Sequence, residues 1–320
     1  EDIKAGGKVI VKADEQLCTA VTGDDGTAVF EQDLPFGSYY IKELQAPYGF
    51  ISSDEIIEVT VSYQGQDVEV VRLKEIFKNQ PTTVEFTKSD LTTGVELDGA
   101  TLTVLDKDGD EIDKWTSVKG EPHIIKRLHV GETYTLREEF APYGYLKAEE
   151  VEFTITDTAE IQKVEMKDDV PIGRIIINKK GEFLSEVTWN EMVAGAMDSI
   201  WDYVTGSLKD VTFEIYARED VKAADGESDD YYKKDELVAT ITTDELGFAR
   251  SDDLPLGKYY VVEKETANGF VLDGEPRDID LTYRDQDTPV VTYDSEWQNS
   301  RQKAKVIVTK KEKDSDRVLE

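Results

Sequence analysis

The chain has 320 residues, a formal net charge of −32, one cysteine and two histidines. This length is enough for roughly two to four small domains. So acidic a surface repels nucleic acid and anionic membranes, which excludes both as partners. Cys18 alone cannot form an internal disulfide, and no cysteine or histidine motif predicts a metal site.

Sequence motifs of common enzymes are missing as well. There is no phosphate-binding loop, no dinucleotide-binding glycine motif and no Ser/His/Asp order, so we expect neither a cofactor nor an enzyme that acts on other molecules. No apolar run of about 18 residues predicts a membrane span. The ends carry no signal peptide or sorting motif, which we expect of an internal fragment whose anchor lies elsewhere.

The composition favours strands over helices. Tyrosine, valine and threonine are frequent, and turn pairs such as Asp25-Gly26 and Asp108-Gly109 recur. We therefore expect an all-β chain built from tandem β-sandwich modules.

Three short sequence patterns repeat along the chain. The first pattern, at 34–50, 130–145 and 254–270, is a glycine turn, a strand and a second turn containing Ala and Gly. Alternate residues of a strand share a face, so a tyrosine and a glutamate of this strand point the same way. A glutamate therefore stands where a core residue is expected. The three glutamates are Glu43, Glu138 and Glu263.

The second and third patterns open and close each module. An opening strand ends in a lysine that shares its face with the preceding apolar residues. These lysines are Lys88, Lys179 and Lys310. A closing segment ends in Asn or Asp shortly before the next opening strand. These closing residues are Asn79, Asp168 and Asn299.

Module boundaries follow from the three patterns. They define a first module (1–80) without its opening strand, a second module (81–171), a third module (172–302) and a final segment (303–320). We expect the final segment to be the first strand of a further module. The linkers near Pro81 and Pro171 are very short, which favours a stiff rod. Because the chain starts and ends inside modules, we expect it to be part of a longer array.

The third module is longer than the others and contains an apolar stretch at 189–208. Residues at roughly helical spacing there are Met192, Val193, Ala196, Ile200 and Val204. The spacing predicts a short amphipathic helix that caps one end of the sandwich.

Each complete module thus supplies a buried lysine, a glutamate and a terminal Asn or Asp. The first and last strands of a sandwich are often neighbours. Burial disfavours charge, so a buried amine has a lowered pKa and a buried carboxyl group a raised one. A neutral amine can then attack the Asn or Asp carbonyl carbon, while a protonated glutamate relays protons. The competing hypothesis is a buried salt-bridge cluster, but recurrence of the triad in successive modules favours the amide bond.

The patterns resemble the collagen-adhesin B-type repeats and the related SpaA-type, prealbumin-like domains of Gram-positive surface proteins. The resemblance rests on the opening lysine strand, the Gly-x-Tyr-x-x-x-Glu strand with its Ala-Pro-x-Gly turn, and the closing Asn or Asp. It implies tandem Ig-like or prealbumin-like (transthyretin-like) sandwiches that form their own isopeptide bonds.

The second module resembles the streptococcal fibronectin-binding form of the family, which implies a Lys88–Asp168 bond with Glu138 as catalyst. Residues 86–90, 134–138 and 164–168 carry this likeness.

The third module resembles the longer clostridial form through residues 178–182 and 298–302. That resemblance implies a Lys179–Asn299 bond with Glu263. Asn268 departs from the family's usual turn, at a distance from this chemistry.

The residues of the two incomplete modules have two possible explanations. Glu43 and Asn79 have no opening lysine of their own, and Lys310 has neither a Glu nor an Asn. Either the fragment boundary explains this, or Lys310 of one molecule couples to Asn79 of the next in a head-to-tail assembly.

We expect the chain to be a structural stalk of a cell-surface adhesin or pilin-like protein, extracellular and anchored to the cell wall outside this fragment. Its partners are neighbouring modules, with host extracellular proteins bound by other domains. The alternative is a module that binds a host or matrix protein itself, with Tyr231 and Tyr232 as contacts. A calcium site at Asp106, Asp108 and Asp110 lacks the downstream glutamate of an EF-hand, so a hairpin turn is the better interpretation.

Overall fold

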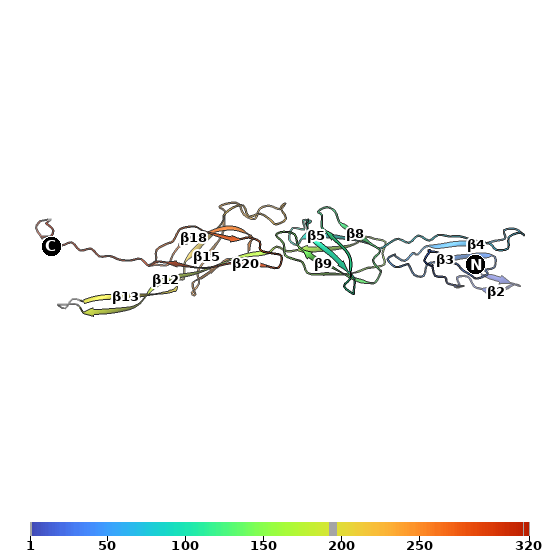
Figure 1. Ribbon diagram of the computed structural model, residues 1–320, viewed down its shortest axis with the longest axis horizontal. Coiled ribbons are helices and arrows are strands. Elements are labelled where there is room, and N and C mark those ends of the chain that lie inside the picture. Colours follow the sequence, from blue (N-terminus) through green and yellow to red (C-terminus); the bar gives the residue numbers. More distant parts are fainter. Residues whose placement is uncertain (1, 192–196, 316, 320) are drawn as a thin grey trace.

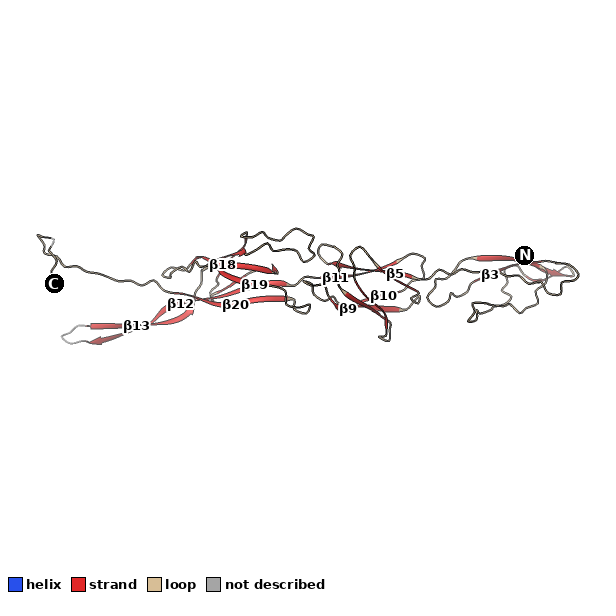
Figure 2. Cartoon of the chain, turned by 45° about the horizontal axis from the view of Figure 1, so that its top comes forward, coloured by secondary structure: helices blue, strands red, loops and turns tan. Residues whose placement is uncertain are grey.

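A computed structural model describes residues 2–191, 197–315 and 317–319 of the chain, which forms an extended row of β-sandwich modules (Figure 1). Every regular element among the described residues is a strand, so the all-β prediction is confirmed (Figure 2). The first module and the final segment lie toward opposite ends of the row. None of the described residues belongs to a helix of the length and apolarity that crossing a membrane requires.

The first module has four strands in two separate two-stranded sheets. They are β1 (Ile3–Ala5), β2 (Lys8–Val11), β3 (Gly37–Lys42) and β4 (Ile56–Val61). Among the described residues from 2 to 81, no hydrophobic side chain is fully buried. The first module therefore lacks the closed core that the next two modules have.

The second module has seven strands in two sheets, with the orders β10-β9-β6-β7 and β11-β5-β8. They are β5 (Thr83–Asp90), β6 (Thr101–Leu105), β7 (Glu111–Thr116), β8 (His123–Lys126), β9 (Thr133–Phe140), β10 (Val151–Thr154) and β11 (Gln162–Asp168). One hydrophobic cluster, which includes Phe86, Leu136 and Met166, fills the space between the sheets. The opening strand β5 runs parallel to the closing strand β11 in the middle of its sheet.

The third module repeats this plan with longer strands. They are β12 (Ile172–Glu191), β13 (Met197–Ser207), β14 (Thr212–Ala217), β15 (Leu237–Thr242), β16 (Phe248–Arg250), β17 (Leu254–Pro255), β18 (Gly257–Glu265), β19 (Arg277–Leu281) and β20 (Val290–Asn299). The opening strand β12 again runs parallel to the closing strand β20, and both contribute to a second core cluster with Phe213 and Trp297.

The predicted helix at 189–208 is wrong for the residues that the structure describes. Strand β12 continues past the sandwich to Glu191 and pairs with β13 in a projecting hairpin (Figure 1). Met192, Val193 and Ala196 lie outside the described residues. A spacing of four, as between Ile200 and Val204, fits one helix face and also one face of a strand, so this signal does not separate the two.

The register of the hairpin gathers most of its large aromatic residues on one face, while Phe183, Ile200 and Val204 lie on the other. Leu184 pairs with Tyr203 and Val187 with Trp201, and strand alternation puts Trp189 on the same face. The side chains of Leu184, Trp189 and Trp201 are about half exposed or more.

The final segment joins no ladder among the described residues. Residues 303–309 have no strand neighbour there, and an isolated bridge joins Lys311 to Val318. Lys310 O accepts a hydrogen bond from Leu319 N at 2.9 Å. The expectation that this segment is the first strand of a further module stays a prediction.

The Ala-Pro-Tyr-Gly turns of the first and second modules each contact the module that follows. Tyr48 stacks on His129 with 4.5 Å between ring centroids, and Gly49 O accepts a hydrogen bond from Thr82 N at 3.0 Å. Tyr143 meets Tyr283 edge-on at 4.9 Å. Successive modules are thus held end to end by packing as well as by short linkers.

Gln286 strengthens the joint between the second and third modules. Its Oε1 accepts a hydrogen bond from Ala141 N at 2.9 Å, and its backbone oxygen accepts one from Lys147 N at 2.9 Å. Both donors flank the turn that carries Tyr143.

We predict that Gly49→Ala loosens the first joint. Gly49 has a φ of 78°, and an added Cβ would lie 2.5 Å from the carbonyl oxygen of Arg127. The left-handed conformation alone costs about 1–2 kcal/mol for an alanine, and the collision forces the modules apart. Small-angle X-ray scattering should show a wider range of inter-module angles. Gly26→Ala is the matched control, because Gly26 has a φ of 73° and open space around its Cβ position; equal effects of both variants would contradict the prediction.

Candidate cross-link sites

Three strands of the second module bring Lys88, Glu138 and Asp168 together. Lys88 Nζ lies 3.0 Å from Glu138 Oε1 and contacts Asp168 Oδ1 directly. The side chains of all three are 0% exposed. The structure therefore brings these three residues, which lie far apart in the sequence, into one buried cluster.

The strand register explains how residues far apart in sequence meet. On β5, Val84, Phe86 and Lys88 alternate inward and are buried, as their shared parity requires. Lys88 pairs with Met166 on the parallel strand β11, so Asp168 is the next inward residue along that strand. Asp168 is fully buried, whereas Asp169 is exposed.

The third module repeats this arrangement with an asparagine. Lys179 Nζ lies 2.6 Å from Glu263 Oε2, and Asn299 Nδ2 donates a hydrogen bond to Glu263 Oε1 at 2.5 Å. Glu263 therefore bridges the amine and the carboxamide. Lys179 pairs with Trp297, and Asn299 follows two residues later, the same diagonal as in the second module.

Burial favours the neutral forms of Asp168 and Lys179. Burial raises the pKa of Asp168 to about 7, although the Lys88 ammonium opposes the shift. Burial likewise lowers the pKa of Lys179, against the opposing charge of Glu263. A neutral amine is a nucleophile, and a protonated carboxyl group is a better acyl acceptor than a carboxylate.

One side-chain oxygen of each closing residue has no hydrogen-bond partner among the described residues. These oxygens are Asp168 Oδ2 and Asn299 Oδ1. A buried polar atom without a partner costs roughly 1–3 kcal/mol. The closing Asp and Asn are therefore the least well satisfied members of the two clusters.

Supporting contacts around the clusters were not predicted from the sequence. Ala148 N donates to Glu138 Oε2 at 2.7 Å, and Asn299 Nδ2 also contacts Thr266 Oγ1 at 2.8 Å. The ring centroids of Phe213 and Trp297 lie 5.6 and 6.0 Å from Lys179 Nζ. These partners come from turns and neighbouring strands, whose positions depend on tertiary packing that no local pattern reveals.

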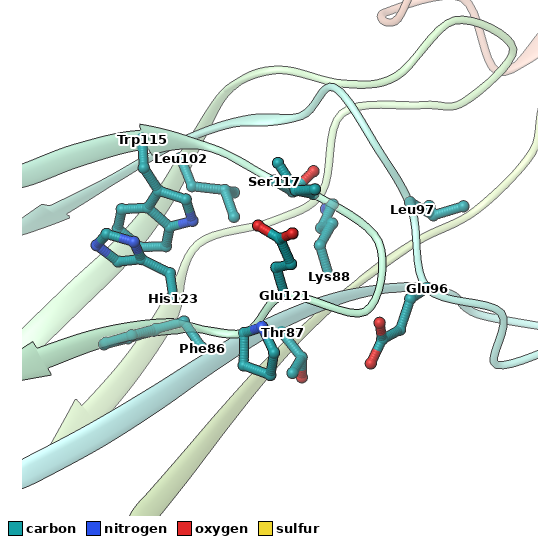
Figure 3. A pocket seen from close by; sticks show the side chains of 12 residues that line it. Phe86, Thr87, Lys88, Glu96, Leu97, Leu102, Trp115, Ser117, Glu121 and His123 are labelled. Carbon is teal, nitrogen blue, oxygen red and sulfur yellow. The ribbon is translucent and has the colours of Figure 1, made fainter.

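The pocket beside Lys88 is too small for a substrate. Lys88, Ser117 and Glu121 are among the residues that line it (Figure 3), and its volume is about 10 Å³. That volume is close to the space that one water molecule needs.

In the first module, Glu43 and Asn79 form a pair without a lysine. Asn79 Nδ2 lies 2.8 Å from both carboxylate oxygens of Glu43, and Ser53 N donates to the same carboxylate at 3.0 Å. No described lysine forms an ion pair with Glu43. Lys310 is exposed, and the final segment that contains it lies toward the opposite end of the row from the first module (Figure 1).

The aspartates at 106–110 form a turn. Asp106 Oδ1 accepts hydrogen bonds from the backbone N–H groups of Asp108 and Asp110, each at 2.9 Å. Within the described residues, no group of three or more His, Cys, Asp or Glu is arranged to hold a metal ion.

The family of SpaA prealbumin-like fold domains matches residues 4–75, 82–170 and 201–297. These stretches cover most of the chain, and each contains one of the three glutamates. The chain belongs to this family, which confirms the resemblance inferred from the repeated patterns. A search of curated proteins found no match.

Among solved structures, the Bacillus anthracis TIE protein is similar in fold, with a TM-score of 0.52 and 24% identity. The match covers 88% of this chain and 45% of that one, so the chain spans less than half of that protein's length. The Streptococcal ancillary pilin matches with 15% identity and a TM-score of 0.27 over 84% of this chain and 76% of that one. GBS52, the minor pilin of Streptococcus agalactiae, matches with 13% identity and a TM-score of 0.28 over 72% and 100% of the two chains.

We predict a pH signature for Asp168 where it is not joined to Lys88, as in a Glu138→Gln chain. Burial is the largest cause of the raised pKa of Asp168 and persists in this variant, so above the ordinary value of 3.8 the folded state holds a proton that the unfolded state releases. The free energy of unfolding of the second module should therefore fall as the pH rises from about 4 to about 7, by on the order of a few kcal/mol. Urea unfolding across this range measures it.

The control for this measurement is the double variant Glu138→Gln with Asp168→Asn. Other acidic groups titrate equally in both chains, so the difference isolates Asp168. Identical pH profiles of the two chains would contradict the prediction.

Proposed function

We propose that the chain is a stalk segment of a Gram-positive cell-surface adhesin or pilin-like protein, stabilised by Lys88–Asp168 and Lys179–Asn299 isopeptide bonds that form without an enzyme. One observation carries this proposal: the same buried triad occurs in the second and third modules. In both, the lysine of the first strand pairs with the residue that stands two positions before the Asp or Asn of the parallel last strand, and a glutamate contacts the lysine. The modules of this stalk are residues 1–80, 81–171 and 172–302, and 303–320 open another.

In the third module, Lys179 Nζ attacks Asn299 Cγ as a neutral amine. The Nζ–Cγ bond forms and the Cγ–Nδ2 bond breaks. Glu263 contacts both nitrogens, so it takes a proton from Nζ and delivers one to Nδ2, which leaves as ammonia. Folding holds the reactants in place, an effect worth roughly 7–11 kcal/mol of barrier.

The second module follows the same course with a carboxyl group. Protonated Asp168 presents its carbon to Lys88 Nζ, and Glu138, 3.0 Å from that amine, relays the proton. The Nζ–Cγ bond replaces a C–O bond, and water leaves. The product amide is neutral and removes an amine and a carboxyl group from the core, where uncompensated charge is costly.

The position of the bond supports a mechanical role. Force applied along the row enters each module through its opening strand and leaves through its closing strand, which are direct neighbours. A covalent link between these strands carries the force past the rest of the sandwich. The bond also resists reducing conditions, unlike a disulfide.

We predict that the intact chain under denaturing, reducing conditions is lighter than its sequence by one water and one ammonia. Glu138→Ala should restore the water and Glu263→Ala the ammonia, because each removes one proton relay. Mass spectrometry of the intact chains measures both.

Glu139→Ala and Glu265→Ala are matched controls for this mass measurement. Each replaces a neighbouring glutamate outside the buried cluster, so each should retain both losses. A wild-type mass equal to the sequence mass would leave the triads as buried ion clusters and refute the stalk mechanism proposed here.

We also predict that the wild type and the Glu138→Ala chain differ in how far the second module extends under a pulling force. The loop closed by Lys88 and Asp168 spans 80 positions, and at about 3.3–3.6 Å per residue its release adds roughly 260–290 Å of length. Single-molecule pulling should show this extension in the Glu138→Ala chain and not in the wild type. An equal extension in both chains would contradict the prediction.

The second candidate function is binding of a host or matrix protein, and one observation favours it. The apolar face of the projecting hairpin exposes Trp189 and Trp201, which are 63% and 51% accessible. Exposed apolar patches of this kind often mark protein contacts. Capture of a matrix protein by the wild type but not by Trp189→Ala with Trp201→Ala would support binding; no difference between them would count against it.

A further inference from the structure

A short segment follows the repeated glycine turn of each module and contacts the strands that carry the cross-link residues. These clamp segments are residues 50–53, 145–148 and 270–273. In the second module, Ala148 N donates to Glu138 Oε2 at 2.7 Å, while Glu138 Oε1 faces Lys88 Nζ at 3.0 Å. Ser53 N makes the same contact with Glu43 Oε2 at 3.0 Å in the first module. In these two modules the clamp segment therefore orients the glutamate.

Each clamp segment also holds the closing segment of its module. One backbone hydrogen bond recurs in all three modules, and its acceptor is the residue directly after the closing Asp or Asn. The donor and acceptor pairs are Ile51 N and Gln80 O at 3.0 Å, Leu146 N and Asp169 O at 2.8 Å, and Val271 N and Ser300 O at 2.8 Å. The repetition ties the end of the closing segment to the turn beside the glutamate strand.

The first side chain of the clamp segment reaches the opening strand at the level of the closing residue. In the second module, Asp90 is the ladder partner of Asp168, and the Tyr145 hydroxyl donates to Asp90 Oδ2 at 2.8 Å. Asp90 and Tyr145 are 5% and 1% exposed. The clamp segment thus joins the opening and closing strands two positions beyond Lys88.

The third module makes the same connection with different side chains. Gly181 is the ladder partner of Asn299, and Phe270 stands where the second module has Tyr145. A Cβ at Gly181 would lie 2.4 Å from Phe270 Cε1, so the ring rests directly on the backbone of β12. A tyrosine meets an aspartate in one module and a phenylalanine meets a glycine in the other. Two unlike contacts at one ladder position indicate that the position itself matters.

We propose that the clamp segments position the reacting groups for the coupling, with Tyr145 and Phe270 as positioning residues. Each segment fixes the opening strand against the closing strand at the level of the Asp or Asn, so the carbonyl carbon stays within reach of the lysine amine. The bond changes and the losses of water and ammonia are those given above, and the clamp segments exchange no protons. The inference therefore rests on the proposed coupling chemistry.

The test measures how fast each bond forms in newly made protein. The whole 320-residue chain is produced by cell-free synthesis, synthesis is stopped, and samples are denatured at intervals. Mass spectrometry of digested samples then quantifies the joined Lys88–Asp168 and Lys179–Asn299 peptides. Because both bonds form in the same molecules, the unaltered module is an internal reference.

Tyr145→Phe should slow the Lys88–Asp168 coupling by on the order of tenfold, because small displacements of reacting groups cost large factors in rate. This variant removes the hydrogen bond to Asp90 and keeps the ring. The Lys179–Asn299 coupling in the same chain should keep its wild-type rate.

Tyr134→Phe is the matched control for the second module. Tyr134 is 2% exposed, and its hydroxyl accepts a hydrogen bond from His129 N at 3.0 Å, so this variant also loses a buried hydroxyl contact. It should leave the coupling rate unchanged. Urea unfolding of both variants in a Glu138→Gln chain, where the bond is absent, compares their stabilities. Coupling rates that follow stability in both variants would overturn the positioning role.

A second pair of variants tests the third module independently. Gly181→Ala pushes against the Phe270 ring and should slow the Lys179–Asn299 coupling by a similar factor. Gly173→Ala is its control, because Gly173 lies eight residues earlier on the same strand and an added Cβ would lie 2.8 Å from Leu281 Cδ1. It crowds the core away from the cluster and should leave the coupling rate unchanged.

The wild-type chain separates this inference from the proposed function. Absence of both joined peptides in the wild type overturns the coupling chemistry and the inference together. Normal coupling in the wild type, with unchanged rates in Tyr145→Phe and Gly181→Ala, overturns the inference alone.

Discussion

The structure depends on the parallel pairing of the first and last strands of each complete module. This pairing buries the opening lysine one diagonal step from the closing Asp or Asn, and it places both against a glutamate from the facing sheet. The described residues of the first module contain no such parallel pair, and no hydrophobic side chain between residues 2 and 81 is fully buried. The parallel pair and the buried site thus occur together in the second and third modules.

The inward-facing lysines and the glutamates of the clusters could be predicted from the sequence, because the alternation of side chains along a strand is a local property. Shared parity was enough to point Lys88 and Lys179 inward, and three repetitions made the glutamates visible. Alternation does not show which strands are neighbours. The roles of Thr266 and Ala148 therefore emerged only from the fold.

The projecting hairpin shows a case in which the spacing of apolar residues does not distinguish a strand from a helix. Ile200 and Val204 are four residues apart, a spacing that suits both a helix and a strand, and only the pairing of β12 with β13 decides between them. The contacts between successive modules could not be predicted from the sequence for another reason. Tyr48 and Tyr143 belong to a repeated turn, yet their contacts with His129 and Tyr283 join segments more than 80 residues apart. No pattern within one module contains that information.

The order of the strands also sets when each buried site can assemble during synthesis. In the second module Lys88 leaves the ribosome early and Asp168 last, with 80 positions between them. A site made from two neighbouring strands of a hairpin could assemble as soon as that hairpin had emerged. Because this site joins the outermost strands, it cannot assemble until the whole module is available to fold.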